Sequence, residues 1–260
     1  MKAIKQAYIS EGIRFFRDKF AKKFNLNLID ANDTKNIEPL AIFSPCTEED
    51  YNLYRNYKGD VTVVWCGSDA MKIDKQREGI LKSRKARHIA ISSFIAKDLD
   101  KLSVPYERIP ISPTNIDLKP FDRGDNIYFY GAADKKKSEF YGEHYLKEIE
   151  ERTGLKIIKA NKNTYSYNEL IEVYKTCFIG LRLTIHDGLP NTAIELGLMG
   201  RRCVHNGETP HSYSYKNVGD ICDAVMKEYE NRHIDDTKQV SKDWRDYVDV
   251  GNEWLYINGK

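Results

Sequence analysis

The sequence predicts an α/β fold of two domains, each built on a parallel β-sheet covered by helices on both faces. Apolar, strand-like runs alternate with helical stretches along residues 1–112, and the alternation starts again after residue 125. Strands that alternate with helices are typical of parallel sheets. Between the two series, residues 110–124 hold three prolines and no clear period. We therefore expect a linker at 113–124.

In the first domain, residues 1–112, the expected strands are short apolar runs bounded by turn residues. They lie at 3–9, 27–30, 40–44, 60–65, 88–92 and 106–111. Apolar residues recur on one helical face at 13–24, and acids fill the first turn of a helix that opens at Thr47. Further helices are expected at 75–85, which is basic, and at 94–102.

In the second domain, residues 125–235, the same pattern predicts strands at 126–130, 155–159 and 178–185 and helices at 141–152, 167–175 and 218–229. Residues 236–260 are expected to form a C-terminal helical tail, helical from 240 to 254 and docked through its two tryptophans. Ligand sites in such sheets lie at the carboxyl ends of strands. The two Rossmann-like domains are therefore expected to face each other across a cleft, lined by the loops after residues 9, 65, 130 and 185.

The strongest functional signal lies in residues 178–204. The strand expected at 178–185 ends at a short loop, and Pro190 stands where a first helical position should be, since its missing N–H costs nothing there. The helix is expected to run to about Met199, with Gly200 as the C′ residue. The segment thus predicts a strand, a tight loop and a helix that begins beside the loop.

Two carboxylates bracket the start of this helix, because Asp187 lies in the loop and Glu195 follows eight positions later. Free N–H groups at Asn191 and Thr192 would point out of the helix N-terminus and suit a phosphate. A carboxylate within the helix could accept hydrogen bonds from sugar hydroxyls. Donors for a diphosphate together with acceptors for hydroxyls are what a nucleotide-sugar requires.

These residues resemble the GT-B glycosyltransferases, and within them the large retaining class marked by an acid–x7–acid motif. HDGLPNTAIELGLMG is similar to that motif, with Asp187 where glutamate is more usual. VVWCGSDA resembles a W-H-G-S/T-D segment of the first domain, with Cys66 where histidine is common, and HIAISSFIAKDL resembles the serine-containing segment that closes that domain. The likeness covers most of residues 60–230, in a chain that is short for the class.

The resemblance implies transfer of a sugar from a UDP- or GDP-linked donor to an acceptor hydroxyl, with no metal or other cofactor. Glu195 would hold the donor ribose, Asp187 would face the donor sugar and Gly12 would lie in a loop that closes near the donor. The implied catalytic residues are Asp187, Asp69 and Arg182, and the implied donor-binding residues are Glu195, Asn191, Thr192, Gly188, Gly12, Lys135, Lys136 and Lys137. One of the three lysines, or Arg182, would hold the diphosphate.

Each of these residues also has a purely structural interpretation. Glu195 could be an exposed helix acid, Asp187 a helix cap, Arg182 a partner in an ion pair and Asp69 an acceptor within its own turn. The three lysines could be a solvated loop. The protein as a whole could also be a nucleotide-sugar-binding protein without catalysis, or another GT-B enzyme such as a nucleotide-sugar epimerase.

The positive charge of the first domain gives only a weak indication of the acceptor. Residues 1–112 carry 20 Lys+Arg against 15 Asp+Glu, a balance of +5, and residues 72–88 alone hold seven Lys+Arg against two acids. This is either ordinary surface variation or the footprint of an anionic acceptor. One candidate is DNA with a hydroxylated base, as modified by bacteriophage enzymes, with the base flipped out. An acidic glycan, a lipid or an anionic membrane surface would suit the same charges.

Other features exclude several classes of protein. The five cysteines contain no CxxC pair and indicate a reduced, cytoplasmic protein without disulfides. No stretch approaches the ~18 apolar residues of a membrane span, and since the first residues hold no long apolar run we expect no secretory leader. The six histidines have no metal-ligand spacing, and no P-loop sequence is present.

Overall fold

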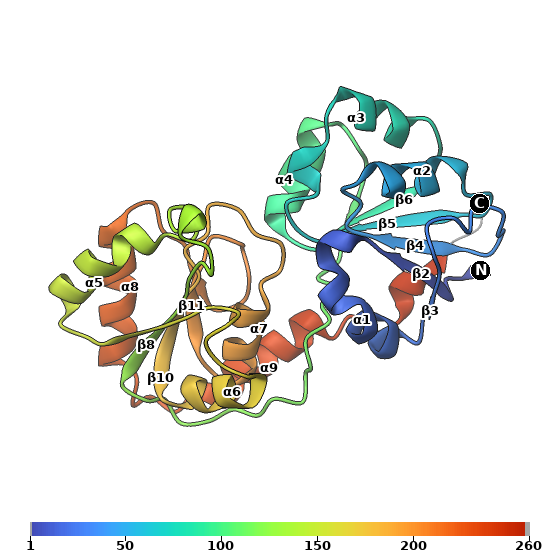
Figure 1. Ribbon diagram of the computed structural model, residues 1–260. Helices are drawn as coiled ribbons and strands as arrows, with labels where there is room; N and C mark the ends of the chain where they lie inside the picture. The colour runs from blue at the N-terminus through green and yellow to red at the C-terminus, as the bar shows by residue number, and fades with distance from the viewer. Residues whose placement is uncertain (1, 258–260) are drawn as a thin grey trace. The chain divides into compact units, whose positions relative to one another are not determined.

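A computed structural model describes residues 2–257 and divides the chain into two compact units (Figure 1). Residues 2–113, 187–189 and 250–257 form the first unit, and residues 114–186 and 190–249 form the second. Both units contain a parallel sheet with helices on its two faces, so the predicted α/β fold is confirmed. The last three residues of the expected tail at 236–260 lie outside the described residues.

The first unit is built on a parallel sheet with the strand order β3-β2-β4-β5-β6-β7 among the described residues. Its strands are β2 (Gln6–Ile9), β3 (Asn27–Leu28), β4 (Leu40–Phe43), β5 (Val61–Trp65), β6 (Arg87–Ala90) and β7 (Glu107–Arg108). The order reverses between β2 and β4, because the chain first steps from β2 to one side and then returns to the other. Such a reversal is where parallel sheets usually bind ligands.

Helices cover both faces of this sheet (Figure 1). They are η1 (Glu11–Phe16), α1 (Arg17–Phe24), α2 (Glu48–Asn56), η2 (Ala70–Lys72), α3 (Lys75–Lys82) and α4 (Ser93–Lys101). Right-handed crossovers place α1 on the face opposite α2, because the two connections step in opposite directions. Helix α2 begins where the sequence predicts, since Thr47 and Asp50 form a reciprocal capping box.

The expected C-terminal helix is shorter than predicted. Helix α9 spans Thr237–Val248, and Gly251 at φ +58° then turns the chain into η5 (Glu253–Leu255) and β13 (Tyr256–Ile257). Strand β13 pairs antiparallel with β1 (Lys2–Ala3). The pattern at 240–254 had predicted one continuous helix, but the helix ends at Val248 and a turn followed by η5 takes the place of its last residues.

The second unit has the strand order β12-β11-β10-β8-β9, again parallel among the described residues. Its strands are β8 (Asn126–Tyr130), β9 (Ile157–Ala160), β10 (Cys177–Leu181), β11 (Arg202–Val204) and β12 (Ser212–Tyr213). Strand β10 ends at Leu181, four residues before the predicted end, because its ladder with β8 and β11 stops there. The strand order reverses between β8 and β10.

Different helices cover the two faces of this second sheet (Figure 1), and each face has its own core. Alternate side chains of β8, namely Ile127 and Phe129, pack with residues of α5 (Leu146–Thr153) and α8 (Val218–Glu230). Tyr128 points to the other face and packs with residues of α6 (Tyr167–Lys175) and α7 (Asn191–Leu198). The two-residue period of the strand thus places Tyr128, and with it Tyr130, on the side that carries α7.

The predicted linker at 113–124 lies along the second unit and is held there by three arginines. Arg245 donates to the carbonyl oxygens of Ile116 and Leu118. The buried Arg201 donates to the carbonyl oxygens of Phe121 and Asp122, at 2.9 and 2.6 Å. The third, Arg123, is itself part of the segment and pairs with Asp236. Ordered contacts of this kind make the segment part of the unit.

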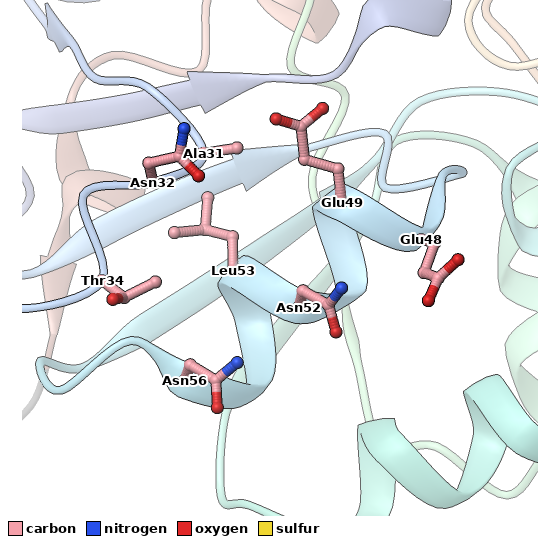
Figure 2. A pocket seen from close by; sticks show the side chains of 8 residues that line it. All are labelled: Ala31, Asn32, Thr34, Glu48, Glu49, Asn52, Leu53 and Asn56. Carbon is pink, nitrogen blue, oxygen red and sulfur yellow. The ribbon is translucent and has the colours of Figure 1, made fainter.

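Two crossovers lack a helix within the described chain, namely residues 29–39 between β3 and β4 and residues 205–211 between β11 and β12. Beside the first lies a groove of about 590 Å³ in the first unit (Figure 2). It is lined by Ala31, Asn32, Thr34, Glu48, Glu49, Asn52, Leu53 and Asn56, the last five from α2. None of the predicted site residues lines this groove. In the described chain no helix has the length and apolar character that crossing a bilayer requires.

Candidate active site

The carboxyl edge of the second sheet carries most of the predicted donor-binding residues. Strands β8 and β10 are neighbours there, and the strand order reverses between them. Arg182 is the first residue after β10, and its backbone N–H is bonded to the carbonyl of Val204 at 3.0 Å. Because β10 ends early, Arg182 lies at the edge of the sheet and not within a strand. This is the position from which α/β folds usually contact a ligand.

The Arg182 side chain is buried against two aromatic rings. Its guanidinium carbon lies 4.8 Å from the ring centre of Tyr130 and 5.1 Å from that of Tyr141. Both distances are within the range of cation–π attraction. The sequence indicated Arg182 as a candidate cation, but it did not indicate these two rings.

Helix α7 begins one residue later than predicted. Pro190 has an extended ψ of 124° and is the N-cap, so Asn191 is the first helical residue. The carbonyl of Pro190 accepts from the N–H groups of Ala193 and Ile194, at 3.0 and 3.2 Å. The N–H groups of Asn191 and Thr192 precede these bonds and remain the candidate phosphate donors.

The side chain of Asn191 accepts a hydrogen bond from Thr114 Oγ1 at 2.8 Å, which ties the start of α7 to residue 114. At the other end of α7, Gly200 has φ +86° and follows the C-cap Met199. The predicted C′ glycine is therefore confirmed. Both ends of α7 are fixed by contacts within the second unit.

Glu195 is buried, with 7% of its surface exposed, so it is not an exposed helix acid. Its Oε2 accepts a hydrogen bond from the hydroxyl of Tyr174 at 3.0 Å. The ring of Tyr174 contacts that of Tyr128 at 4.8 Å between centres. Burial and the charge of Glu195 both raise the pKa of Tyr174 well above its usual value, so this tyrosine stays a hydrogen-bond donor.

Tyr128 lies within electrostatic reach of both Glu195 and Arg182. Burial raises its pKa most, the charge of Glu195 raises it further and the charge of Arg182 lowers it. Tyr167, the first residue of α6, is partly exposed, and its pKa rises to about 12 through burial and then through the charge of Glu195. The carboxylate and the guanidinium are therefore grouped around the tyrosines of one sheet face.

The three lysines of the loop after β8 lie on the surface. Lys135, Lys136 and Lys137 form the short helix η3, and all three are exposed. The loop itself is held by Glu143, which accepts from the N–H of Ala132 at 2.8 Å and pairs with Lys159 at 2.7 Å. Of the cations predicted for a diphosphate, Arg182 is the one that the sheet edge holds in a defined position.

In the first unit, Asp69 is buried and stabilises the turn after β5. Its Oδ1 accepts from the N–H of Gly67 at 2.6 Å, and its Oδ2 accepts from the N–H of Cys66 at 3.2 Å. Burial raises the pKa of Asp69 to about 6, although these hydrogen bonds oppose the rise. Its environment agrees with the structural interpretation, in which Asp69 bonds its own turn.

Residues 187–189 belong to the first unit. The two acids of the motif therefore lie in different units, Asp187 in the first and Glu195 in the second. The carbonyl of Asp187 accepts from Ser92 Oγ at 3.3 Å, and its Oδ1 accepts from the N–H of Gly188 at 2.9 Å. A Cβ on Gly188 would lie 2.0 Å from the carbonyl oxygen of Cys66, so only glycine fits there. These contacts fix the backbone of the loop at 187–189.

Gly12 was expected in a loop but lies in the short helix η1 that follows β2, and a Cβ on it would lie 3.1 Å from Cys46 Sγ. A buried carboxylate that the sequence did not single out organises this edge. Asp50 accepts from Tyr8 and Ser10 hydroxyls at 2.8 and 2.7 Å, and from the N–H of Cys46 at 2.6 Å. The serine just after β2 and the capping acid of α2 were visible in the sequence, but their pairing depends on strand register.

Solved structures share this arrangement of sheets and helices. The chain aligns with a mutant of S. aureus TarM, solved in complex with fondaparinux, alpha-GlcNAc-glycerol and UDP, at TM-score 0.56 and 10% identity over 84% of this chain and 53% of that chain. It aligns with sucrose-phosphate synthase from Thermosynechococcus elongatus at TM-score 0.54 and 11% identity over 93% of this chain and 74% of that one. The chain has the GT-B fold.

The GT-B fold is thus shown by structure alone. Neither models of known protein families nor curated protein sequences give a match to this sequence. The chain spans about half the length of the TarM chain that it matches, at 53%. The GT-B scaffold assigns no activity by itself, so function has to be argued from the residues at the sheet edges.

The structure also bears on a possible metal site. Among residues 2–257, no group of three or more histidine, cysteine, aspartate and glutamate side chains is placed to hold a metal ion. In the second unit, the candidate groups for contact with an anionic ligand are the Arg182 guanidinium, the N–H groups at the start of α7 and the three exposed lysines at 135–137. The sequence signals that could have indicated the neighbouring rings were the tyrosines at 128 and 130, which share a strand face.

Proposed function

We propose that this protein is a glycosyltransferase that moves a sugar from a nucleotide-diphospho-sugar to an acceptor hydroxyl. The observation that carries the proposal is that Arg182, which contacts Tyr130, and Glu195, which is bonded to Tyr174, meet tyrosines of the one sheet face that α7 covers. These groups supply a cation and N–H donors for a diphosphate, together with a buried carboxylate for hydroxyls. The GT-B fold and the UDP found with TarM support a donor of this class.

In the proposed reaction, Glu195 accepts hydrogen bonds from the donor ribose. Arg182 and the N–H groups of Asn191 and Thr192 contact the diphosphate, with one of the exposed lysines at 135–137 as a second cation. The bond between the sugar C1 and the diphosphate oxygen breaks, and its electron pair stays on that oxygen. The acceptor oxygen bonds to C1, and its proton passes to the departing diphosphate oxygen. Oriented donors stabilise the charge that develops on the leaving diphosphate, so the proposed step is metal-independent.

In this proposal Asp69 of the first unit lies on the acceptor side. Gly12 and Gly188 contribute to donor binding, and Asp187 faces the donor sugar. The acceptor could be a hydroxylated base in DNA, a glycan or a lipid. The arginines of the basic segment at 72–88 have internal partners, which leave fewer of their N–H groups for an anionic acceptor. Arg84 donates to the carbonyls of Tyr54, Tyr57 and Gly59, Arg87 pairs with Glu107, and Arg77 donates to the carbonyl of Lys72.

A donor panel tests the proposal. The protein is incubated with UDP- and GDP-sugars, with and without EDTA, and released nucleoside diphosphate is measured. Slow release by hydrolysis, undiminished by the chelator, is the expected result. Proton NMR of the first product anomer then tests the retaining outcome that the resemblance implies. Absence of both binding and release for every donor would remove the proposal.

Two alternatives predict different outcomes of the same panel. A nucleotide-sugar-binding protein without catalysis would bind one donor tightly and release no diphosphate. A nucleotide-sugar epimerase would convert one donor into its epimer with no acceptor. For the DNA acceptor, binding to duplex DNA should fall steeply with salt, since phosphate contacts release counterions. No binding at low salt would exclude DNA and leave a glycan or lipid.

A further inference from the structure

The contact between Arg182 and two tyrosine rings is the most specific feature of the second unit that the proposed function leaves unexplained. The guanidinium lies 4.8 Å from the Tyr130 ring and 5.1 Å from the Tyr141 ring. The rings are 6.1 Å apart and tilted by 43°. Tyr130 is the last residue of β8, and Tyr141 comes from the loop between η3 (Lys135–Lys137) and η4 (Glu143–Tyr145). Elements distant in sequence thus meet at one side chain.

Aromatic rings hold an arginine in a way that suits an anionic ligand. A carboxylate in the place of a ring would offset the positive charge and compete with a phosphate for the N–H groups. A ring attracts the flat face of a guanidinium through its quadrupole and adds no charge. The five N–H donors lie in the guanidinium plane, away from that face. A ring can therefore hold an arginine side chain without itself adding a charge that opposes a diphosphate.

A close backbone approach at Gly142 places the Tyr141 ring beside Arg182. Gly142 has φ +74°, and a Cβ there would lie 2.6 Å from the Cβ of Leu183, the residue after the arginine. The N–H of Ile185 donates to the carbonyl of Phe140 at 3.1 Å. The segment that carries Tyr141 is therefore pressed against the segment that carries Arg182, at a distance that only glycine permits.

The Tyr130 side is fixed in a similar way. Gly131 follows the strand, and a Cβ there would lie 2.6 Å from Glu143 Oε1 and 2.9 Å from the ring of Phe129. Glu143 in turn accepts from the N–H of Ala132. The turn after β8 is thus held close to the sheet, which keeps the Tyr130 ring beside the end of β10.

We propose that Tyr130 and Tyr141 are positioning residues, which hold the Arg182 guanidinium toward the diphosphate of the donor. The inference rests on the proposed function, because it takes the ligand to be a nucleoside diphosphate. It assigns a role to two residues outside the predicted site. Neither ring needs to contact the substrate, so their effect on binding must pass through Arg182.

A double-mutant cycle tests this dependence. The affinity for UDP and for GDP is measured by calorimetry in wild type, Tyr130→Leu, Tyr141→Leu, Arg182→Gln and both double variants. Each leucine variant should bind the preferred nucleotide about 3- to 20-fold more weakly, the range of a partly desolvated cation–π contact. In the Arg182→Gln background, the same leucine changes should have no further effect. Tyr130→Phe and Tyr141→Phe should restore the affinity, because the ring remains.

Tyr229→Leu is the matched control. Its ring also covers an arginine, Arg232 at 3.9 Å, in the same unit, and it should leave the affinity unchanged. Thermal unfolding shows whether each variant is folded. Weaker binding that persists in the Arg182→Gln background would overturn the inference and leave the proposed function intact, as would unchanged binding in both leucine variants. Failure of wild type to bind either nucleotide would overturn both.

Discussion

The hydroxyl of Tyr174 donates a hydrogen bond to Glu195 Oε2 at 3.0 Å, within the buried face of the second sheet. The two residues come from α6 and α7, so the bond joins two helices as well as two polar groups. A buried carboxylate needs hydrogen-bond donors, and Tyr174 supplies one without adding charge. Tyr174 therefore holds the carboxylate of Glu195 in place without neutralising it.

Glu195→Gln should weaken nucleotide binding. Hydrogen bonds to a charged group contribute about 1.5–3 kcal/mol, and the amide is a weaker acceptor that also presents an unwanted donor. We expect the affinity for UDP or GDP to fall about 10- to 100-fold, measured by calorimetry. Because the side chain is buried, the substitution can also change stability, so the free energy of unfolding of the variant is measured in urea.

The exposed acid Glu172, which pairs with Lys175 on α6, is the control. Glu172→Gln should leave nucleotide affinity unchanged and cost less than about 0.5 kcal/mol of stability. Equal affinity in wild type and Glu195→Gln would contradict the assignment of this carboxylate to the ribose.

Most of the fold could be predicted because its signals are local. The capping box at Thr47, the isolated apolar run of β5 and the glycine at 200 each act within a few residues. The end of β10 could not be predicted in this way. Leu183 and Thr184 continue the apolar run and are buried, but a strand also needs a hydrogen-bonded neighbour, and the ladder to β11 stops at Leu181.

In the candidate site, too, the local signals could be predicted and the contacts between distant segments could not. The acids, the helix start and Arg182 were visible as a pattern, because their spacing along the chain carries the signal. The rings around Arg182 were not, since Tyr130 and Tyr141 reach it only through the parallel pairing of β8 with β10 and the turn at Gly142. The sequence shows that Tyr128 and Tyr130 share a strand face. It does not show the register and the close backbone approach that bring Tyr130 and Tyr141 to Arg182.

Gly197 and Gly79 provide a matched pair of helix glycines. A Cβ on Gly197 in α7 would lie 2.2 Å from the ring of Trp244, whereas a Cβ on Gly79 in α3 meets nothing within 4 Å. Gly197→Ala should therefore overpack the contact between α7 and α9 and destabilise the protein by about 1–3 kcal/mol. Gly79→Ala should stabilise it by about 0.5–1 kcal/mol, since alanine loses less backbone entropy.

Urea unfolding of both glycine variants gives the two free energies, and calorimetry with the preferred nucleotide adds a functional reading. Because α7 carries Glu195, the Gly197 variant should also bind nucleotide more weakly, while the Gly79 variant should bind normally. Changes of the same sign in both variants would show that the Trp244 contact does not decide the effect.

Arg201→Met should destabilise the second unit by about 2–4 kcal/mol. The guanidinium is fully buried and donates to backbone carbonyls, including those of Cys177 at 3.2 Å and Lys175 at 3.3 Å. Burial lowers its pKa to about 10, which reflects the cost of holding the charge there. Methionine fills similar space, but the carbonyls stay buried without their donor, at about 1–3 kcal/mol each where no water reaches them.

Hydrogen exchange locates the effect of this substitution. The N–H groups of Phe121 and Gly124 bond to the carbonyls of Met199 and Cys177, so their protection reports whether residues 119–124 remain attached. Both should exchange faster in Arg201→Met. The surface variant Arg152→Ala, which loses only an exposed pair with Glu148, should leave protection and stability nearly unchanged. Protection equal to wild type in Arg201→Met would mean that other contacts hold the segment.

Asp69 should make stability fall as the pH rises from about 4 to 6. Burial raises its pKa to about 6 in the folded protein, against about 3.9 in an unfolded chain. The folded state therefore binds the proton more tightly across this window, and ionisation opposes folding by about 3 kcal/mol once the pH is above 6. The amide in Asp69→Asn does not titrate, so the variant should lose this pH dependence. Urea unfolding of wild type and Asp69→Asn at several pH values gives their free energies of unfolding. The value for Asp69→Asn minus that for wild type should rise by about 3 kcal/mol between pH 4 and 7. A difference that stays constant over this range would show that Asp69 has an ordinary pKa.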